Sequence, residues 1–328
     1  MRRVVRACLS IIATVLSVTA AASAAAKEEA YPERPIRMMI PWAVGGSTDM
    51  LGRVLAERMG RELGTSIVVE NKPGATGTIG YAQVARAPAD GYTMLLGTNS
   101  TFAIAPHFYR DLSYDIVKDF VPVGMIGANQ QVLCVHPKVP ATTLEELIKL
   151  SEKQPGQLTY ASSGVGGSSH LATELLMEAT GIEMLHVPYR GGAPALQAIL
   201  GGQTNVGFVD ISIAEPLIRS GQLRALGTSG KNRAPLLPNV PTLAEAGAKD
   251  FESSTTFGLF MPAGVPPKVV ERVNRALNAA MKDPEVSKKL GLMGYELTGD
   301  SAGSYAEYAK AESDKWGKLI SVRNIALP

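Results

Sequence analysis

Cysteine is scarce in this sequence. The 328 residues contain two, Cys8 and Cys134. Cys8 lies in an N-terminal stretch with the features of a removable export signal, so the exported chain would keep one thiol and could form no intramolecular disulfide. Cys134 lies in the strand-like run at 132–135, where it is expected to be a small buried apolar residue.

Histidine is also rare, and the net charge is small. The four histidines, at positions 107, 136, 170 and 186, show no metal-ligand spacing, so no metal and no cofactor are expected. Lysine and arginine number 32 against 30 aspartates and glutamates, and the net charge of +2 includes the N-terminal arginines. A nearly neutral chain does not favour nucleic acid or an anionic membrane surface as a partner.

The motifs of several common enzymes are missing. No Gly-x-x-x-x-Gly-Lys-Ser/Thr phosphate loop occurs, and the glycine pair Gly164 and Gly166 lacks the third glycine of a dinucleotide fingerprint, because Ser169 stands in its place. Ser168 is not in a Gly-x-Ser-x-Gly elbow, because position 170 is histidine. We therefore expect a protein that is not an enzyme, with a serine hydrolase using Ser168 and His170 as the less favoured alternative.

The N-terminus predicts export. Arginines at positions 2, 3 and 6 precede an apolar run from residue 7 to about 22, and small-residue cleavage sites follow at Ala22-Ser23-Ala24 and Ala24-Ala25-Ala26. This pattern is typical of a signal peptide, here residues 1–26, and places the mature protein in the periplasm. A membrane anchor is the alternative, but the run is short and rich in alanine, serine and threonine.

Short apolar strands alternate with helices along the rest of the chain. Strands are expected at 36–40, 67–70, 92–96, 158–161, 185–187, 206–209, 223–228 and 257–261. Helices are expected at 48–63, 78–86, 169–180, 193–200, 268–281, 284–290 and 302–320. This alternation predicts parallel β-α-β units, and therefore an α/β fold.

The length suits two lobes better than one small core. We place the chain crossings near 125–132 and 245–257, which gives a first lobe of residues 27–127 and 251–328 and a second lobe of residues 128–250. Two crossing segments would form a hinge, and a hinge allows a cleft to close on a ligand.

Three loops, at 43–49, 74–78 and 162–169, share one chemistry. Each is rich in glycine, serine and threonine, and each precedes an expected helix. In α/β sheets ligands bind at such loops, beyond the carboxyl ends of the strands. Free N–H groups at a helix start favour an anion, so the loops predict a site for a carboxylate. Thr98, Asn99 and Ser100 add polar groups at the same edge.

Several residues at these loops allow two interpretations. Ser47 is expected to cap the helix that follows it. Asp49 could receive a ligand amino or hydroxyl group, or stabilise its own helix N-terminus, and the second is favoured. Arg190 could pair with a ligand carboxylate or lie exposed. Asp210 could line the cleft or satisfy backbone donors.

The chain resembles a known family along nearly its whole mature length. The similarity is carried, in order, by YPERPI at 31–36, PWAVGGSTD at 41–49, VENKPGA at 69–75, DGYT at 90–93, YASSG at 160–164, HVPYRG at 186–191, LGGQ at 200–203, LPNVPT at 237–242 and AEAG at 244–247. These stretches are similar to the substrate-binding proteins of tripartite tricarboxylate transporters, which include the Bug group. The sequence departs from the pattern at Thr76, where glycine is common, at Tyr81, where a small residue is common, and at Trp42, where phenylalanine is frequent.

The resemblance implies a two-lobed periplasmic-binding-protein fold, of the Venus-flytrap, type II-like kind with a hinge. It also implies a monomeric receptor that delivers a small carboxylate to membrane permease subunits, or alternatively a sensing subunit. Together with the three loops, the resemblance gives a set of candidate ligand-binding residues. They are Trp42, Ala43, Val44, Gly45, Gly46, Ser47, Asp49, Gly77, Thr78, Thr98, Ser100, Ser163, Gly164, Ser168, His170, Tyr189, Arg190, Gly191 and Asp210.

Overall fold

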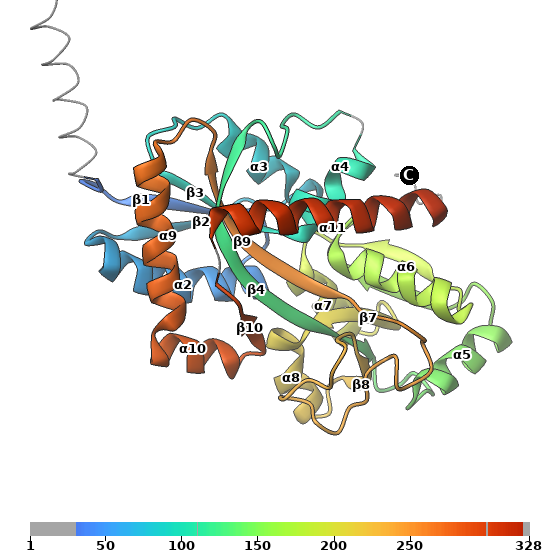
Figure 1. Cartoon of the computed structure of the whole chain (residues 1–328). Helices are drawn as coiled ribbons and strands as arrows, with labels where there is room; N and C mark the ends of the chain where they lie inside the picture. Colours follow the sequence, from blue (N-terminus) through green and yellow to red (C-terminus); the bar gives the residue numbers. More distant parts are fainter. Residues whose placement is uncertain (1–30, 110, 300, 324–328) are drawn as a thin grey trace, which may run out of the picture.

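The computed structural model describes residues 31–109, 111–299 and 301–323. The expected signal peptide lies outside the described residues. The described chain is an α/β protein built around a curved sheet that has two halves, each flanked by helices on both faces (Figure 1). No helix in the described ranges is both long and apolar enough to cross a membrane.

The first half of the sheet contains the N-terminal strands. Its order is β2 (Ile67–Asn71), β1 (Ile36–Ile40), β3 (Thr93–Thr98), β9 (Ser254–Pro262) and the first part of β4 (Phe120–Val135), which also pairs with β10 (Tyr295–Leu297). The strands β2, β1 and β3 are parallel, as the alternation of strands and helices predicts, and β9 runs antiparallel to β3.

The second half contains the middle of the chain. Its order is β6 (Leu185–Pro188), β5 (Thr159–Ser162), β7 (Val206–Asp210) and the last part of β4, which also pairs with β8 (Arg224–Thr228). The 16-residue strand β4 therefore runs through both halves. Its partner changes from β9 at Gln130 to β7 at Gln131. The lobe boundaries at 128 and 251 stay a prediction.

Alternating side chains of the strands meet helices on opposite faces. In β1, Ile36, Met38 and Ile40 pack into one cluster with helices α2 (Ser47–Leu63), α9 (Pro267–Lys282) and α10 (Pro284–Gly291). Met39 faces the other way, toward α3 (Thr78–Ala85) and α11 (Ala302–Arg323). This is the two-residue repeat of a strand that is covered on both faces.

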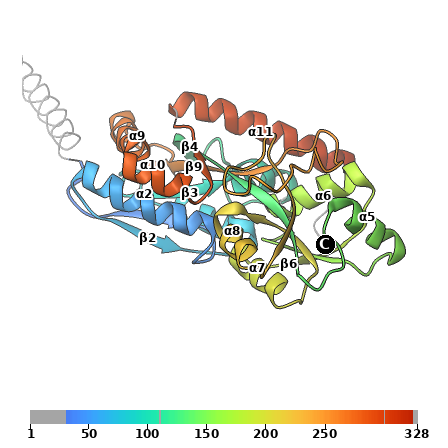
Figure 2. The ribbon, with the colours of Figure 1, turned by 90° about the horizontal axis from the view of Figure 1, so that it is seen from below.

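The second half follows the same rule. Leu133 and Val135 pack with α5 (Leu144–Lys153) and α6 (Ser168–Thr180), whereas Val132 and Cys134 face α7 (Gly192–Leu200) and α8 (Ile211–Arg219). Cys134 is fully buried in this apolar layer, which confirms the expectation from the sequence. The long helix α11 lies across β4 and reaches the short helical stretch of Ser100–Ile104 and Ala105–Phe108 (Figures 1 and 2).

Candidate ligand-binding site

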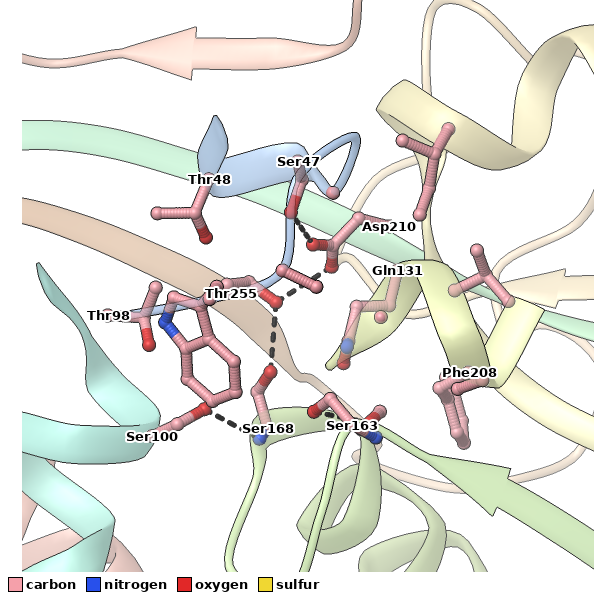
Figure 3. A pocket seen from close by; sticks show the side chains of 18 residues that line it. Ser47, Thr48, Thr98, Ser100, Gln131, Ser163, Ser168, Phe208, Asp210 and Thr255 are labelled. Carbon is pink, nitrogen blue, oxygen red and sulfur yellow. Dashed lines mark hydrogen bonds between the residues drawn. The ribbon is translucent and has the colours of Figure 1, made fainter. Parts of the chain in front are cut away.

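A cavity lies where the two halves of the sheet meet (Figure 3). It is lined by Trp42, Ala43, Gly46, Ser47, Thr48, Thr98, Ser100, Gln131, Ser163, Ser168, Ser169, Gly192, Ala195, Phe208, Val209, Asp210, Ile213 and Thr255. Its volume of about 50 Å³ is small. Polar groups on opposite walls consequently contact one another.

Four helices begin at this cavity. The first residues of α2, α6 and α7 line it, and so does Asp210, which precedes α8. The residues before α2, α6 and α7 are glycines, and none of the four helices receives a side-chain capping bond. First-turn N–H groups and the helix dipoles contribute positive potential at this cavity. The described lining residues include no lysine, arginine or histidine, so an anion would be held by neutral donors.

A chain of hydrogen bonds crosses the cavity (Figure 3). The Ser47 hydroxyl donates to Oδ2 of Asp210, and Thr255 Oγ1 donates to the other carboxylate oxygen at 2.7 Å. Because the Thr255 proton is used in that bond, the Ser168 hydroxyl donates to Thr255 at 3.0 Å. The Ser168 N–H donates to Oγ of Ser100 at 2.8 Å. Groups that a ligand could use thus hold the two halves together.

Ser47 does not cap its helix, so that prediction was wrong. The N-cap position is Gly46, and the Ser47 side chain is turned to Asp210 instead. The backbone carbonyl of Ser47 accepts a bond of 2.6 Å from the Tyr295 hydroxyl, which fixes the start of α2. A charged acceptor on the opposite wall makes the stronger partner for this hydroxyl.

Asp49 fixes the shape of the loop at 43–49 from the side away from the cavity. Its buried carboxylate accepts the Gly45 N–H at 3.0 Å and the Asn71 amide at 3.0 Å, and it pairs with Arg53 at 2.9 Å. Burial raises its pKa, but the bonds from Arg53, Gly45 and Asn71 outweigh this effect and leave the pKa below its usual value. Asp49 does not line the cavity, so the geometry favours the structural interpretation.

Asp210 lies in the cavity and is the one ionisable side chain among the described lining residues. Burial raises its pKa, and the hydrogen bonds from Ser47, Thr255 and Gln131 oppose that rise. Although Asp210 is the N-cap of α8, its carboxylate makes no capping bond to that helix. It points across the cavity, as Figure 3 shows.

Three buried polar atoms at the cavity have no hydrogen-bond partner within the described part of the chain. They are Nε1 of Trp42, Oγ1 of Thr98 and Oε1 of Gln131. Buried polar atoms are nearly always paired, so unpaired ones that share a cavity indicate a place for a ligand.

A second cavity adjoins the first and shares Trp42 and Ser163 with it. Its other lining residues are Gly74, Ala75, Thr76, Tyr109, Gly164, Val165, Pro188, Tyr189 and Arg190. Here the halves are again linked, because the Thr76 hydroxyl donates to the Val165 carbonyl at 2.5 Å. Arg190 is exposed at this position.

The expected site residues therefore divide into three groups. The first cavity brings together Trp42, Ala43, Gly46, Ser47, Thr98, Ser100, Ser163, Ser168 and Asp210. Gly164, Tyr189 and Arg190 line only the second cavity. Val44, Gly45, Asp49, Gly77, Thr78, His170 and Gly191 line neither.

His170 lies behind the loop at 162–169. Its Nδ1 accepts the Gly166 N–H at 3.1 Å, and its ring stacks on that of His186 at 4.1 Å, which in turn stacks on Tyr160 at 4.7 Å. Burial and the neighbouring His186 lower the pKa of His170 to about 3. Burial lowers the pKa of His186 to about 4. Both rings are neutral at pH 7 and support the shape of the loop.

Sequence reasoning missed part of the lining. Thr48 and Ser169 lie within the expected loops without having been singled out. The lining residues that were not expected are Gln131, Gly192, Ala195, Phe208 and Thr255. Gln131 lies on β4, which runs through both halves, and Thr255 lies on β9, which pairs with β4. The polar run of Asn129, Gln130 and Gln131 inside an otherwise apolar strand was the available signal for Gln131.

A family model described as the tripartite tricarboxylate transporter family receptor matches residues 51–325. The chain belongs to this family. Three solved structures carry the same fold at 30–34% identity. Rpa4515 of R. palustris with adipate has a TM-score of 0.88 at 34% identity, over 90% of this chain and 99% of its own. The periplasmic binding protein BugD has a TM-score of 0.86 at 34% identity, over 90% and 99%.

The third structure is MatC of Rhodopseudomonas palustris with bound malate. Its TM-score is 0.84 at 30% identity, over 88% of this chain and all of its own. The family and the fold together make this chain a periplasmic-binding-protein relative with two lobes, as the sequence predicts.

Proposed function

We propose that this receptor-family protein is exported to the periplasm, captures a small carboxylate in the cavity between its lobes, and delivers it to the membrane permease of a tripartite transporter. One observation carries the proposal. Four helix N-termini meet at a cavity whose described lining has no basic side chain. Such a site suits a carboxylate gripped by N–H and hydroxyl groups.

The relatives support the ligand class and the role. Two solved structures of similar proteins hold adipate and malate, and both molecules are carboxylates. The family takes its name from a transporter with separate membrane subunits, and an N-terminal export signal fits a receptor that works outside the membrane. A monomer that releases its ligand unchanged would suffice for this role.

The serine hydrolase alternative has little support in the geometry. The Ser168 hydroxyl is engaged with Thr255, and Nδ1 of His170 accepts from Gly166, so these two side chains do not form a nucleophile and base. His186 does lie 2.6 Å from the Ser162 hydroxyl, but Ser162 is fully buried and does not reach the cavity.

A thermal-shift screen of carboxylates and their amides tests the proposal. Ligand at about 100 times its dissociation constant adds about 2.7 kcal/mol of stability, which raises the melting temperature by several degrees. We expect at least one acid to stabilise the protein while its amide does not. No acid-specific shift, in protein first unfolded and refolded to remove any bound metabolite, would count against the proposal.

A matched pair of substitutions locates the site. Thr98 and Thr204 are both buried and both have a hydroxyl without a partner among the described residues, but only Thr98 lines the cavity. We expect Thr98→Val to weaken binding of the stabilising acid by about 2- to 10-fold, the worth of one hydrogen bond. Thr204→Val should leave the affinity unchanged. Equal affinities for both variants would place the ligand elsewhere.

A further inference from the structure

The walls of the cavity differ in hydrogen-bonding character. The helix starts of α2, α6 and α7 present donors, whereas Asp210 and Gln131 present acceptors. These two residues face each other directly across the antiparallel pair of β4 and β7. Directly opposite residues in such a pair project to the same side of the sheet, so their acceptors lie together.

Asp210 and Gln131 can each accept a further hydrogen bond. An ionised carboxylate can accept about four hydrogen bonds. Ser47 and Thr255 donate one each to the two oxygens of Asp210, and the Gln131 amide donates a third bond, which leaves room for a further donor. The Gln131 side chain is 2% exposed, and its Oε1 has no partner within the described residues. The cavity therefore holds a carboxyl group with no cation on its described lining, and a buried acceptor with no donor among the described residues.

A plain dicarboxylate matches only one side of this site. Its oxygens can accept from the helix N–H groups, but they offer nothing to Asp210 and Gln131. Two carboxylates close together also repel each other, so binding would require one to take up a proton. A site built around buried acceptors discriminates strongly against a ligand that lacks the matching donor.

Building on the proposed function, we propose that the ligand is a carboxylic acid that also carries a hydrogen-bond donor near its carboxylate, an ammonium or a hydroxyl group, and that Asp210 and Gln131 receive this donor. The ligand carboxylate lies at the helix N-termini. The donor group lies at the start of α8 and satisfies Oε1 of Gln131. Asp210 and Gln131 thus set which acids bind, while the helix starts hold the feature that all of them share.

Calorimetry with six acids at pH 7.5 tests this inference. They form two skeleton-matched sets, which are succinate, malate and aspartate, and adipate, 2-hydroxyadipate and 2-aminoadipate. In at least one set, we expect a donor-bearing acid to bind at least about tenfold tighter than the plain diacid, the usual effect of a hydrogen bond to a charged group. If the 2-amino acid binds tightest, the donor is an ammonium; if the 2-hydroxy acid does, it is a hydroxyl.

Three variants assign the effect to residues. Asp210→Asn keeps an acceptor for Thr255 but removes the charge, and we expect it to reduce the preference for the donor-bearing acid by about tenfold. Gln131→Met should reduce the same preference while leaving Asp210 in place. Gln130→Met is the control, because Gln130 is the preceding residue of β4 and bonds to Glu296 away from the cavity. It should leave the preference unchanged.

Two results overturn the inference. In the first, succinate and adipate bind as tightly as their hydroxy and amino derivatives, and the affinities stay the same in the Asp210→Asn and Gln131→Met variants. Cooperative unfolding of both variants would show that they are folded. In the second, none of the six acids binds. The proposed function fails only on a different result, namely that the wider screen of acids and amides finds no acid-specific stabilisation.

Discussion

The stacked histidines behind the ligand loop should make the protein sensitive to mild acid. His170 is 4% exposed and has a folded-state pKa of about 3, and His186 is half-buried with a pKa of about 4. In the unfolded chain both would have pKa values near 6.5. The unfolded state therefore binds protons that the folded state does not bind. As a result, the free energy of unfolding falls as the pH drops below about 6.5.

The magnitude follows from the pKa difference. Between pH 6.5 and pH 5 a group that stays neutral in the folded state loses about 1.4 kcal/mol per pH unit, or about 2 kcal/mol for His170. Solvent screening reduces the contribution of the half-buried His186 to about 1 kcal/mol. Glu174, whose carboxylate lies 3.7 Å from Nε2 of His170 and accepts the Tyr160 hydroxyl, limits the effect by favouring a charged ring. The expected total is about 3 kcal/mol.

Urea unfolding at pH 7.5 and pH 5.0 measures this loss. His170→Phe keeps a ring in the stack but cannot titrate, so its stability should fall by about 2 kcal/mol less than the wild type over the same interval. The variant should be less stable at pH 7.5, because the Gly166 N–H loses its acceptor. His136→Gln, on the opposite side of the second half, is the control. An identical pH dependence in the wild type and His170→Phe would show that His170 does not cause the loss of stability in mild acid.

Two further substitutions probe the contacts between the halves. Thr76 has a φ of 53°, and its hydroxyl donates to the Val165 carbonyl. Thr76→Gly relieves the backbone strain but removes this bond, so the free energy of unfolding should change by less than about 1 kcal/mol. Because the lost bond joins the two halves, ligand binding measured by calorimetry should weaken several-fold. Unchanged affinity would show that this bond between the halves does not support ligand binding. Gly191 has a φ of 123°, and a Cβ there would lie 3.3 Å from that of Ala43, so Gly191→Ala should lower the free energy of unfolding by about 1–3 kcal/mol. Gly192→Ala should not, because its Cβ would make only an ordinary contact of 3.9 Å with Ile213. Equal unfolding midpoints in urea would contradict this.

The sequence predicts the repeating units of the fold well, because each unit is a local pattern. The strand at 36–40 has the bounds expected, and the first helix ends at Leu63 as expected and begins one residue early, at Ser47. Pattern reasoning recognised only the last residues of β4. Pro122, Gly124 and Gly127 interrupt the apolar run, and the register with β9 shifts at two places there. A long strand with bulges does not keep the strict alternation on which strand prediction depends.

The site could be predicted only in part. Loops at the carboxyl ends of strands follow from topology, so Ser47, Ser100 and Ser168 were found. The role of Ser47 was not, because its partner Asp210 is 163 residues away and no local rule reveals it. Thr255 was missed for the same reason, since it reaches the cavity through the sheet order rather than through a loop.

Tryptophan fluorescence can show whether the ligand binds in the cavity between the halves. The chain has two tryptophans, and Trp42 lines the cavity with its Nε1 unpaired among the described residues, whereas Trp316 is buried in a separate apolar cluster and bonds to Glu312. We would titrate a Trp316→Phe variant with the acid that stabilises the protein most. We expect a saturable change in Trp42 emission with the dissociation constant found by calorimetry. Calorimetric saturation with no change in emission would contradict it, because the ligand would then bind away from the cavity.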